Sequence, residues 1–163
     1  MFHENALALR VGAEEKNLGM IIDVSSNCFS IMGIKNQTLL YRKIENIMPR
    51  CVAMYHRGFM NDYKEIGKTV MLGNVMNFYI RHAKQHVFPG EIYTKIAPSL
   101  EFGLTYLALI RKSLDLNAST ILTFSDGRVD SMSDGLMEEF GLKKKKLLRG
   151  TFYFVTLDFI YII

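Results

Sequence analysis

The chain has 163 residues, of which 49% are apolar and 22% are charged, and its formal net charge is +4. This composition excludes a disordered chain and, at this length, predicts about one globular domain of ordinary size. Four of the positive charges form the run Lys143 to Lys146, so the rest of the chain is close to neutral. We therefore expect no nucleic-acid partner.

The two cysteines indicate a reducing compartment. Cys28 and Cys51 lie in apolar segments, without the CxxC or His/Cys spacing of a metal site, so we expect buried thiols and neither a disulfide nor a zinc site. The start of the chain lacks the basic region and the long apolar run of a secretory signal. The expected setting is cytoplasmic.

The first third of the chain predicts a hairpin followed by short helices. The apolar runs Ala6 to Val11 and Met20 to Val24 are separated by a turn at Lys16 to Gly19, which is typical of paired strands. Ser25, Ser26 and Asn27 offer N-cap oxygens for a brief helix that Gly33 would end. Asn36 to Asn46 is more polar, and its three apolar residues predict another short turn on the same core, namely Leu39, Leu40 and Ile44.

The segment Ile47 to Gly67 predicts the main helix of the chain. Pro49 suits a first helical turn and Gly67 a C-terminal stop. Apolar residues recur at three and four positions, so we expect one face of the helix to pack on a sheet through Val52, Tyr55, Phe59, Tyr63 and Ile66. Gly58 destabilises the middle by roughly 1 kcal/mol relative to alanine, so two short helices meeting there fit as well as one.

Beyond Gly67 the apolar period changes to two. Apolar and polar residues alternate over Met76 to Arg81 and over Glu91 to Ile96, while Leu104 to Ile110 is apolar on both faces. The connections are short, which favours an antiparallel meander. Together with the opening hairpin, this gives an α+β fold with five strands in one sheet and the short helices on one face.

A partial repeat follows. Residues 19–34 align without a gap with residues 127–142, and the glycine and serine positions Gly19/Gly127, Ser25/Ser133 and Gly33/Gly141 are identical. Residues 119–124, followed by Asp126-Gly127, add a preceding strand and a hairpin turn. We therefore predict a complete domain in residues 1–113 and the beginning of a second, incomplete unit in residues 114–163, with an apolar C-terminal tail.

The order of these elements and their motifs resembles a PAS domain. The matching residues are Gly19-x-Ile21-x-x-Val24-Ser25 with Gly33, Ile47-Met48-Pro49, His56 with Phe59, Phe88-Pro89, and Ile110-Arg111. The resemblance implies a five-stranded antiparallel sheet whose short helices close over a small apolar cavity, and a truncated second PAS repeat after it. The run from Ile47 to Arg111 is similar to PAS repeats of large multi-pass membrane proteins of unicellular eukaryotes. Two positions depart from the pattern, since Tyr41 and the turn Lys84-Gln85-His86 stand where a glycine is usual.

The resemblance implies a non-catalytic sensory and interaction module of a signalling protein. Its expected partners are another protein or a second copy of the chain, with a small apolar ligand in the cavity. The alternative is a structural docking subunit that uses the fold as a scaffold in a larger assembly. The module would be cytoplasmic, either free or as the cytosolic part of a membrane-associated protein.

Cofactor and metal sites have few candidates. His56 matches the axial haem ligand of haem-binding PAS sensors, which makes haem sensing a minor alternative. However, Met76 stands where those sensors place a distal arginine, and no flavin-binding motif surrounds Cys51. His82 and His86 flank the hairpin turn but make an incomplete metal shell. No acid/base pair or nucleophile arrangement is recognisable, so we predict neither a catalytic nor a metal site.

The C-terminal tail has an ambiguous pattern. Leu147 to Ile163 is interrupted by Arg149, Gly150 and Asp158, which leaves too little apolar length to span a bilayer comfortably. Phe152 to Ile163 has the composition of a strand. The lysine run predicts a solvated loop, with membrane contact through Lys143 to Ile163 as the alternative.

Overall fold

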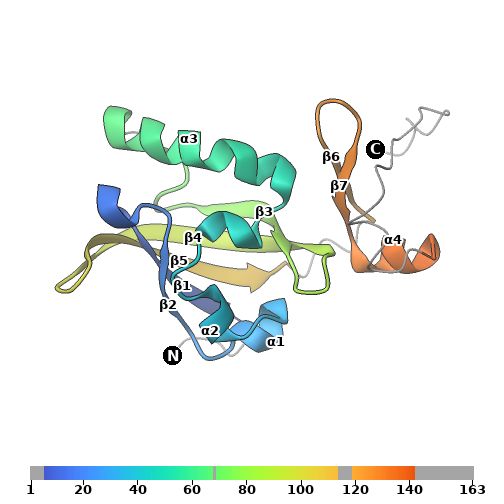
Figure 1. Cartoon of the computed structure of the whole chain (residues 1–163), viewed down its shortest axis with the longest axis horizontal. Coiled ribbons are helices and arrows are strands. Elements are labelled where there is room, and N and C mark those ends of the chain that lie inside the picture. The colour runs from blue at the N-terminus through green and yellow to red at the C-terminus, as the bar shows by residue number, and fades with distance from the viewer. Residues whose placement is uncertain (1–5, 68, 114–118, 142–163) are drawn as a thin grey trace.

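The computed structural model describes residues 6–67, 69–113 and 119–141. Its main sheet has five antiparallel strands in the order β2-β1-β5-β4-β3 (Figure 1). Their bounds are β1 Ala6–Gly12, β2 Ile21–Val24, β3 Val75–Arg81, β4 Val87–Ser99 and β5 Gly103–Lys112. The opening hairpin, predicted from two apolar runs and a turn, and the meander and single sheet, predicted from the alternation beyond Gly67, are confirmed.

The interior strand β1 shows why the chain folds into a sheet with one buried face. Leu7, Leu9 and Val11 are buried, whereas the residues between them are half-buried and face the other side. This is the twofold period of a strand that is packed on one side only. Both edges of β1 are paired, with β2 on one side and β5 on the other.

Short helices between β2 and β3 cover this face, as predicted. They are α1 Cys28–Met32, α2 Asn36–Leu39, the 3₁₀ turn η2 Ile44–Ile47, and α3 Arg50–Ile66; a further 3₁₀ turn, η1 Glu15–Asn17, joins β1 to β2. Met32, Leu39 and Ile47 are buried in one cluster with the inner residues of the sheet. Gly33 ends α1 with a φ of 69°, as its position predicts.

The predicted N-cap oxygens of α1 have a different role. Ser25 Oγ accepts a hydrogen bond from the Ala8 N–H (2.9 Å), and the Asn27 amide donates to the Ala6 carbonyl. Asn27 is the N-cap residue by position, but its side chain makes no cap hydrogen bond. These side chains therefore fasten the helix to the neighbouring strand.

Helix α3 is one continuous helix through Gly58, so the alternative of two short helices is wrong. The expected inner face is wrong in part, because Val52, Tyr55 and Ile66 are 37%, 55% and 67% exposed. Tyr63 is half-buried as expected, and Phe59, although 62% exposed, borders the space beneath the helix. Beyond the first turn, the half-buried positions are His56, Met60 and Tyr63, which lie at i, i+4 and i+7. Gly67 ends the helix as predicted, with its N–H donating to the Tyr63 carbonyl (2.8 Å).

The two positions where the resemblance expects glycine keep a left-handed backbone. Among the described residues, Tyr41 (φ 62°) and Gln85 (φ 72°) are the two non-glycine residues with positive φ. Each lies in a tight connection, Tyr41 after α2 and Gln85 in the β3–β4 turn. The fold therefore imposes the conformation even where the side chain disfavours it.

A second, separate hairpin follows, with β6 Ile121–Thr123, β7 Val129–Met132 and the short helix α4 Asp134–Glu139. In Figure 1 it lies beyond the end of the main sheet. Met132, Leu136 and Met137 form a small buried cluster of its own. The predictions for the lysine run and the apolar tail lie outside the described residues. No helix in the described part of the chain is long and apolar enough to cross a membrane.

Candidate functional site

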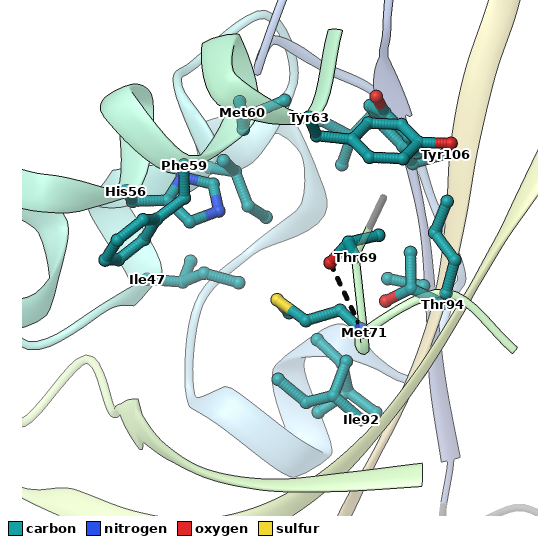
Figure 2. A pocket seen from close by; sticks show the side chains of 15 residues that line it. Ile47, His56, Phe59, Met60, Tyr63, Thr69, Met71, Ile92, Thr94 and Tyr106 are labelled. Atoms are coloured by element: carbon teal, nitrogen blue, oxygen red, sulfur yellow. Dashed lines mark hydrogen bonds between the residues drawn. The ribbon is translucent and has the colours of Figure 1, made fainter. Parts of the chain in front are cut away.

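A cavity of about 150 Å³ lies between α3 and the inner face of the sheet. Figure 2 shows His56, Phe59, Met60 and Tyr63 of α3 on one side, and Ile92, Thr94 and Tyr106 of the sheet on the other. Most of its walls are apolar. The remaining lining residues are Val11, Ile44, Ile47, Thr69, Met71, Leu72, Ala108 and Ile110.

The cavity exists because α3 does not settle fully on the sheet. No residue of α3 is fully buried, although the strands beneath it present Ala108 and Ile110, which are 9% and 2% exposed. The small side chain of Ala108 leaves room that a larger residue would fill. The space is partly open to solvent, and its volume of about 150 Å³ equals that of an enclosed apolar cavity in an engineered protein that takes up benzene or xenon.

A pair of polar side chains fixes the rotation of α3. His56 Nδ1 lies 3.0 Å from Glu45 Oε1 of η2, and the two side chains are 16% and 21% exposed. This contact directs the imidazole inward and leaves Tyr55 outside. His56 is the one nitrogen-bearing side chain among the described residues that line the cavity. It can therefore offer one directional polar contact to a ligand.

Two tyrosines lie together on the cavity wall. The rings of Tyr63 and Tyr106 pack edge to face, with centroids 6.2 Å apart. Burial, followed by the neighbouring Tyr63, raises the pKa of Tyr106. Below them the Thr69 hydroxyl accepts a hydrogen bond from the Met71 N–H (3.2 Å; Figure 2). These residues join α3 to the sheet through aromatic contacts that a ligand beneath the helix would touch.

The cavity does not accommodate a porphyrin in this conformation. Pockets for drug-sized ligands begin at about 300 Å³, and haem is larger than most such ligands. The contact between His56 Nδ1 and Glu45 leaves Nε2 free, as in many metal-ligating histidines. The small volume, and not the chemistry of His56, therefore argues against the haem that the resemblance offered as a minor alternative.

The two cysteines are free thiols with raised pKa values. Cys28 is buried and Cys51 is half-buried. Burial raises the pKa of Cys28 to about 11, and burial with the charge of Asp130 raises the pKa of Cys51 to about 11. Both are protonated at neutral pH and thus poor nucleophiles and poor metal ligands.

The histidines that flank the β3–β4 turn stack on each other. The rings of His82 and His86 are 4.4 Å apart and nearly parallel, and His86 Nδ1 lies 3.2 Å from Asp134 of α4. Burial is the main cause that lowers the pKa of His82 to about 4. Across the described residues, no group of three side chains is placed to hold a metal ion.

The second hairpin contacts the first unit at the start of α3, which the sequence patterns did not indicate. Asp130 Oδ2 accepts a hydrogen bond from the Cys51 N–H (3.3 Å), and the Thr120 hydroxyl donates to the Tyr79 hydroxyl (3.2 Å). Cys51 is the second residue of α3, and its N-cap residue Pro49 has no side-chain acceptor. Asp130 therefore takes the place of a capping side chain. Its only sequence signal is its position after the predicted hairpin turn.

Solved structures show what this arrangement is similar to. The PAS domain of an HTR-like protein from Haloarcula marismortui aligns with a TM-score of 0.53 at 15% identity, covering 68% of this chain and 84% of that one. The PAS domain of a protein from Colwellia psychrerythraea aligns with a TM-score of 0.50 at 12% identity, covering 71% and 91%. No protein-family model and no curated protein matches the sequence. At these identities the likeness concerns the fold, and the chain has the α+β PAS fold with its five-stranded antiparallel sheet.

Proposed function

We propose that this protein is a non-catalytic sensory module of a signalling protein and that it binds a small apolar ligand beneath α3. The observation that carries the proposal is the apolar cavity of about 150 Å³ under a helix without fully buried residues. A ligand of benzene size fits this volume. The free thiols of Cys28 and Cys51 support a reducing, cytoplasmic setting.

The mechanism is a population shift of α3. A ligand that fills the cavity favours the helix position that closes on it, by its difference in affinity for the two positions. Asp130 of the second hairpin binds the first turn of α3. Movement of the helix would therefore reach the second hairpin through this contact as well as through the linker at 112–117.

We further propose that residues 119–141 open a second PAS unit. The Ala8 N–H donates to Ser25 Oγ (2.9 Å), and the Thr120 N–H donates to Ser133 Oγ (3.1 Å) in the same way. Both hairpins carry a bulge at the same place, between Arg10 and Val11 in one and between Leu122 and Thr123 in the other. This shared register supports a boundary near residue 113.

Titration with benzene and indole tests the cavity. We expect saturable chemical-shift changes, in two-dimensional NMR spectra of the full chain, at residues of α3 and β5. Ala108→Leu fills the cavity and should abolish these changes. Ala8→Leu is the matched control, because Ala8 lies on the opposite face of the sheet. Equal binding by wild type and Ala108→Leu would contradict the proposal.

Docking through α3 is the second candidate function. Apolar side chains of this helix face outward, with Tyr55 and Ile66 55% and 67% exposed. Such exposed apolar side chains are typical of an interaction surface. If a second copy of the chain covers it, the mass in solution rises with concentration and Tyr55→Asp prevents the rise. A constant monomer mass would argue against a homodimer.

Haem binding through His56 has a separate test. From the cavity volume we expect hemin titration to give no Soret band of a ligated iron. A band that appears with the wild type and disappears in His56→Ala would contradict this expectation and support the haem alternative.

A further inference from the structure

A second hollow, distinct from the apolar cavity, lies between the α1–α2 segment and the β3–β4 turn. Its volume is about 580 Å³, which is within the roughly 300–1,000 Å³ typical of ligand pockets. Three elements contribute to it: α1 through Phe29, the segment around α2 through Lys35 and Arg42, and the turn through Arg81 and Gln85. We call this hollow the basic groove.

The charges in the basic groove have one sign. Lys35, Arg42 and Arg81 line it, and the described lining residues include no aspartate or glutamate. None of the ion pairs found within the described residues involves these three side chains. Three cationic groups around one hollow raise the local concentration of anions.

Among the three basic residues, Arg81 gives the clearest indication of an anion-binding site. It is half-buried, and its guanidinium donates to a neutral acceptor, Gln85 Oε1 (3.1 Å from Nε). Burial, followed by the charge of Arg50, lowers the pKa of Arg81, and the charge of Asp130 opposes this effect. A partly desolvated guanidinium without a carboxylate partner is destabilising, and a bound anion would relieve that destabilisation.

The groove also has an apolar wall. Phe29 is 61% exposed although it is a large aromatic residue, and Ile34 and Leu39 continue the wall beside it. Inorganic ions make no use of such a surface. A ligand that uses both walls must carry an anionic group and an apolar body.

We propose that the basic groove binds a small organic anion, with its carboxylate or phosphate held by Arg42, Arg81 and Lys35 and its apolar body against Phe29. Arginine forks bind carboxylate and phosphate oxygens in pairs, which gives such a site orientation as well as charge. His82 borders the groove, and because its pKa is lowered to about 4 it adds a neutral polar group at pH 7. The site is independent of the apolar cavity and of the function proposed for it.

The test is calorimetric titration of the full chain with phenyl phosphate at low ionic strength. Inorganic phosphate has only the anionic group and phenol only the aromatic ring. Titrated separately, each should bind at least about tenfold more weakly than phenyl phosphate. Arg42→Gln and Lys35→Gln change exposed residues, so we expect both variants to fold. Each should weaken phenyl phosphate by about tenfold, which corresponds to about 1.4 kcal/mol.

Arg57→Gln is the matched control, because Arg57 is an exposed arginine of α3 outside the groove. It removes the same charge and should leave the affinity within about twofold. Three outcomes would overturn the proposal: no binding of phenyl phosphate, equal affinity for inorganic phosphate, or equal weakening by Arg57→Gln and Arg42→Gln. Sedimentation with phosphatidic acid vesicles tests whether the groove binds a membrane surface in place of a small molecule. Binding to vesicles alone, lost in Arg42→Gln, would assign the groove to a membrane surface and overturn a small-molecule site.

Discussion

Substituting aspartate on the two faces of α3 gives a sharp test of how this helix sits. Tyr55 is 55% exposed and Met60 is half-buried over the cavity. Tyr55→Asp exchanges one exposed residue for another, so its effect on the free energy of unfolding should stay within about 0.5–1 kcal/mol. Met60→Asp loses roughly 1 kcal/mol of apolar burial, about half the value of a fully buried methionine. It also places a carboxylate beside apolar walls, which adds a desolvation penalty of about 1–3 kcal/mol.

The expected difference between the two variants is therefore about 1–3 kcal/mol. At about 2–4 °C per kcal/mol for a chain of 163 residues, Met60→Asp should melt about 4–8 °C below Tyr55→Asp. Circular dichroism melts of the full chain measure it, and the two variants share the same helix-propensity penalty of aspartate to within a few tenths of a kcal/mol. If Tyr55→Asp lowers the melting temperature as much as Met60→Asp does, the outward orientation of Tyr55 is wrong.

Four other substitutions test three separate features of the fold. Gly33→Ala and Gly67→Ala both force alanine into a left-handed backbone, but the new Cβ would lie 2.7 Å from the His82 ring at Gly33 and in open space at Gly67. Gly67→Ala should therefore lower the free energy of unfolding by about 1–2 kcal/mol, and Gly33→Ala should lower it by clearly more. If denaturant unfolding gives the same decrease for both variants, Gly33 does not lie close to the His82 ring. The pKa of His82 is lowered from 6.5 to about 4 in the folded protein. Between these pH values the unfolded chain therefore binds more protons than the folded chain does. The stability linked to His82 is complete above pH 6.5 and is lost as the pH falls toward 4. A plot of the free energy of unfolding against pH should therefore be flatter for His82→Asn than for the wild type between pH 4 and 6.5. If both proteins give the same slope, the pKa of His82 is not lowered. Asp130→Ala should weaken the first turn of α3 by about 0.5–2 kcal/mol, seen as faster hydrogen exchange at Cys51, whereas protection equal to the wild type would show that the contact does not cap the helix.

The sheet could be predicted from the sequence because its signals are local. Alternation in β3 and β4, the apolar runs of β1, β2 and β5 and the short connections each follow from neighbouring residues, and together they leave few topologies open. The left-handed glycines Gly33 and Gly67 are local signals too. The structure confirms each of them.

The orientation of α3 could not be predicted, because both of its faces carry large apolar residues. Val52 and Tyr55 continue one stripe while Met60 lies on the other, and Tyr63 is compatible with both. The contact between His56 and Glu45 decides between them. It joins residues eleven apart through a turn whose geometry no periodicity reveals.

The basic groove escapes sequence reasoning for a similar reason. Lys35 and Arg42 are close in sequence, but Arg81 joins them only after the β3–β4 turn packs beside α1 and α2. In the sequence, three separated basic residues predict nothing more than solvated side chains on the surface. Only the folded chain shows that no carboxylate lies among them.

The left-handed conformations of Tyr41 and Gln85 offer a route to a more robust protein. A side chain in this region raises the energy of the native state by about 1–2 kcal/mol, whereas glycine there loses about 0.5–1 kcal/mol in backbone entropy. Tyr41 is 65% exposed, so little packing opposes its exchange for glycine. The native backbone is thus strained at two turns, and a glycine at either position could remove the strain there without altering the path of the chain.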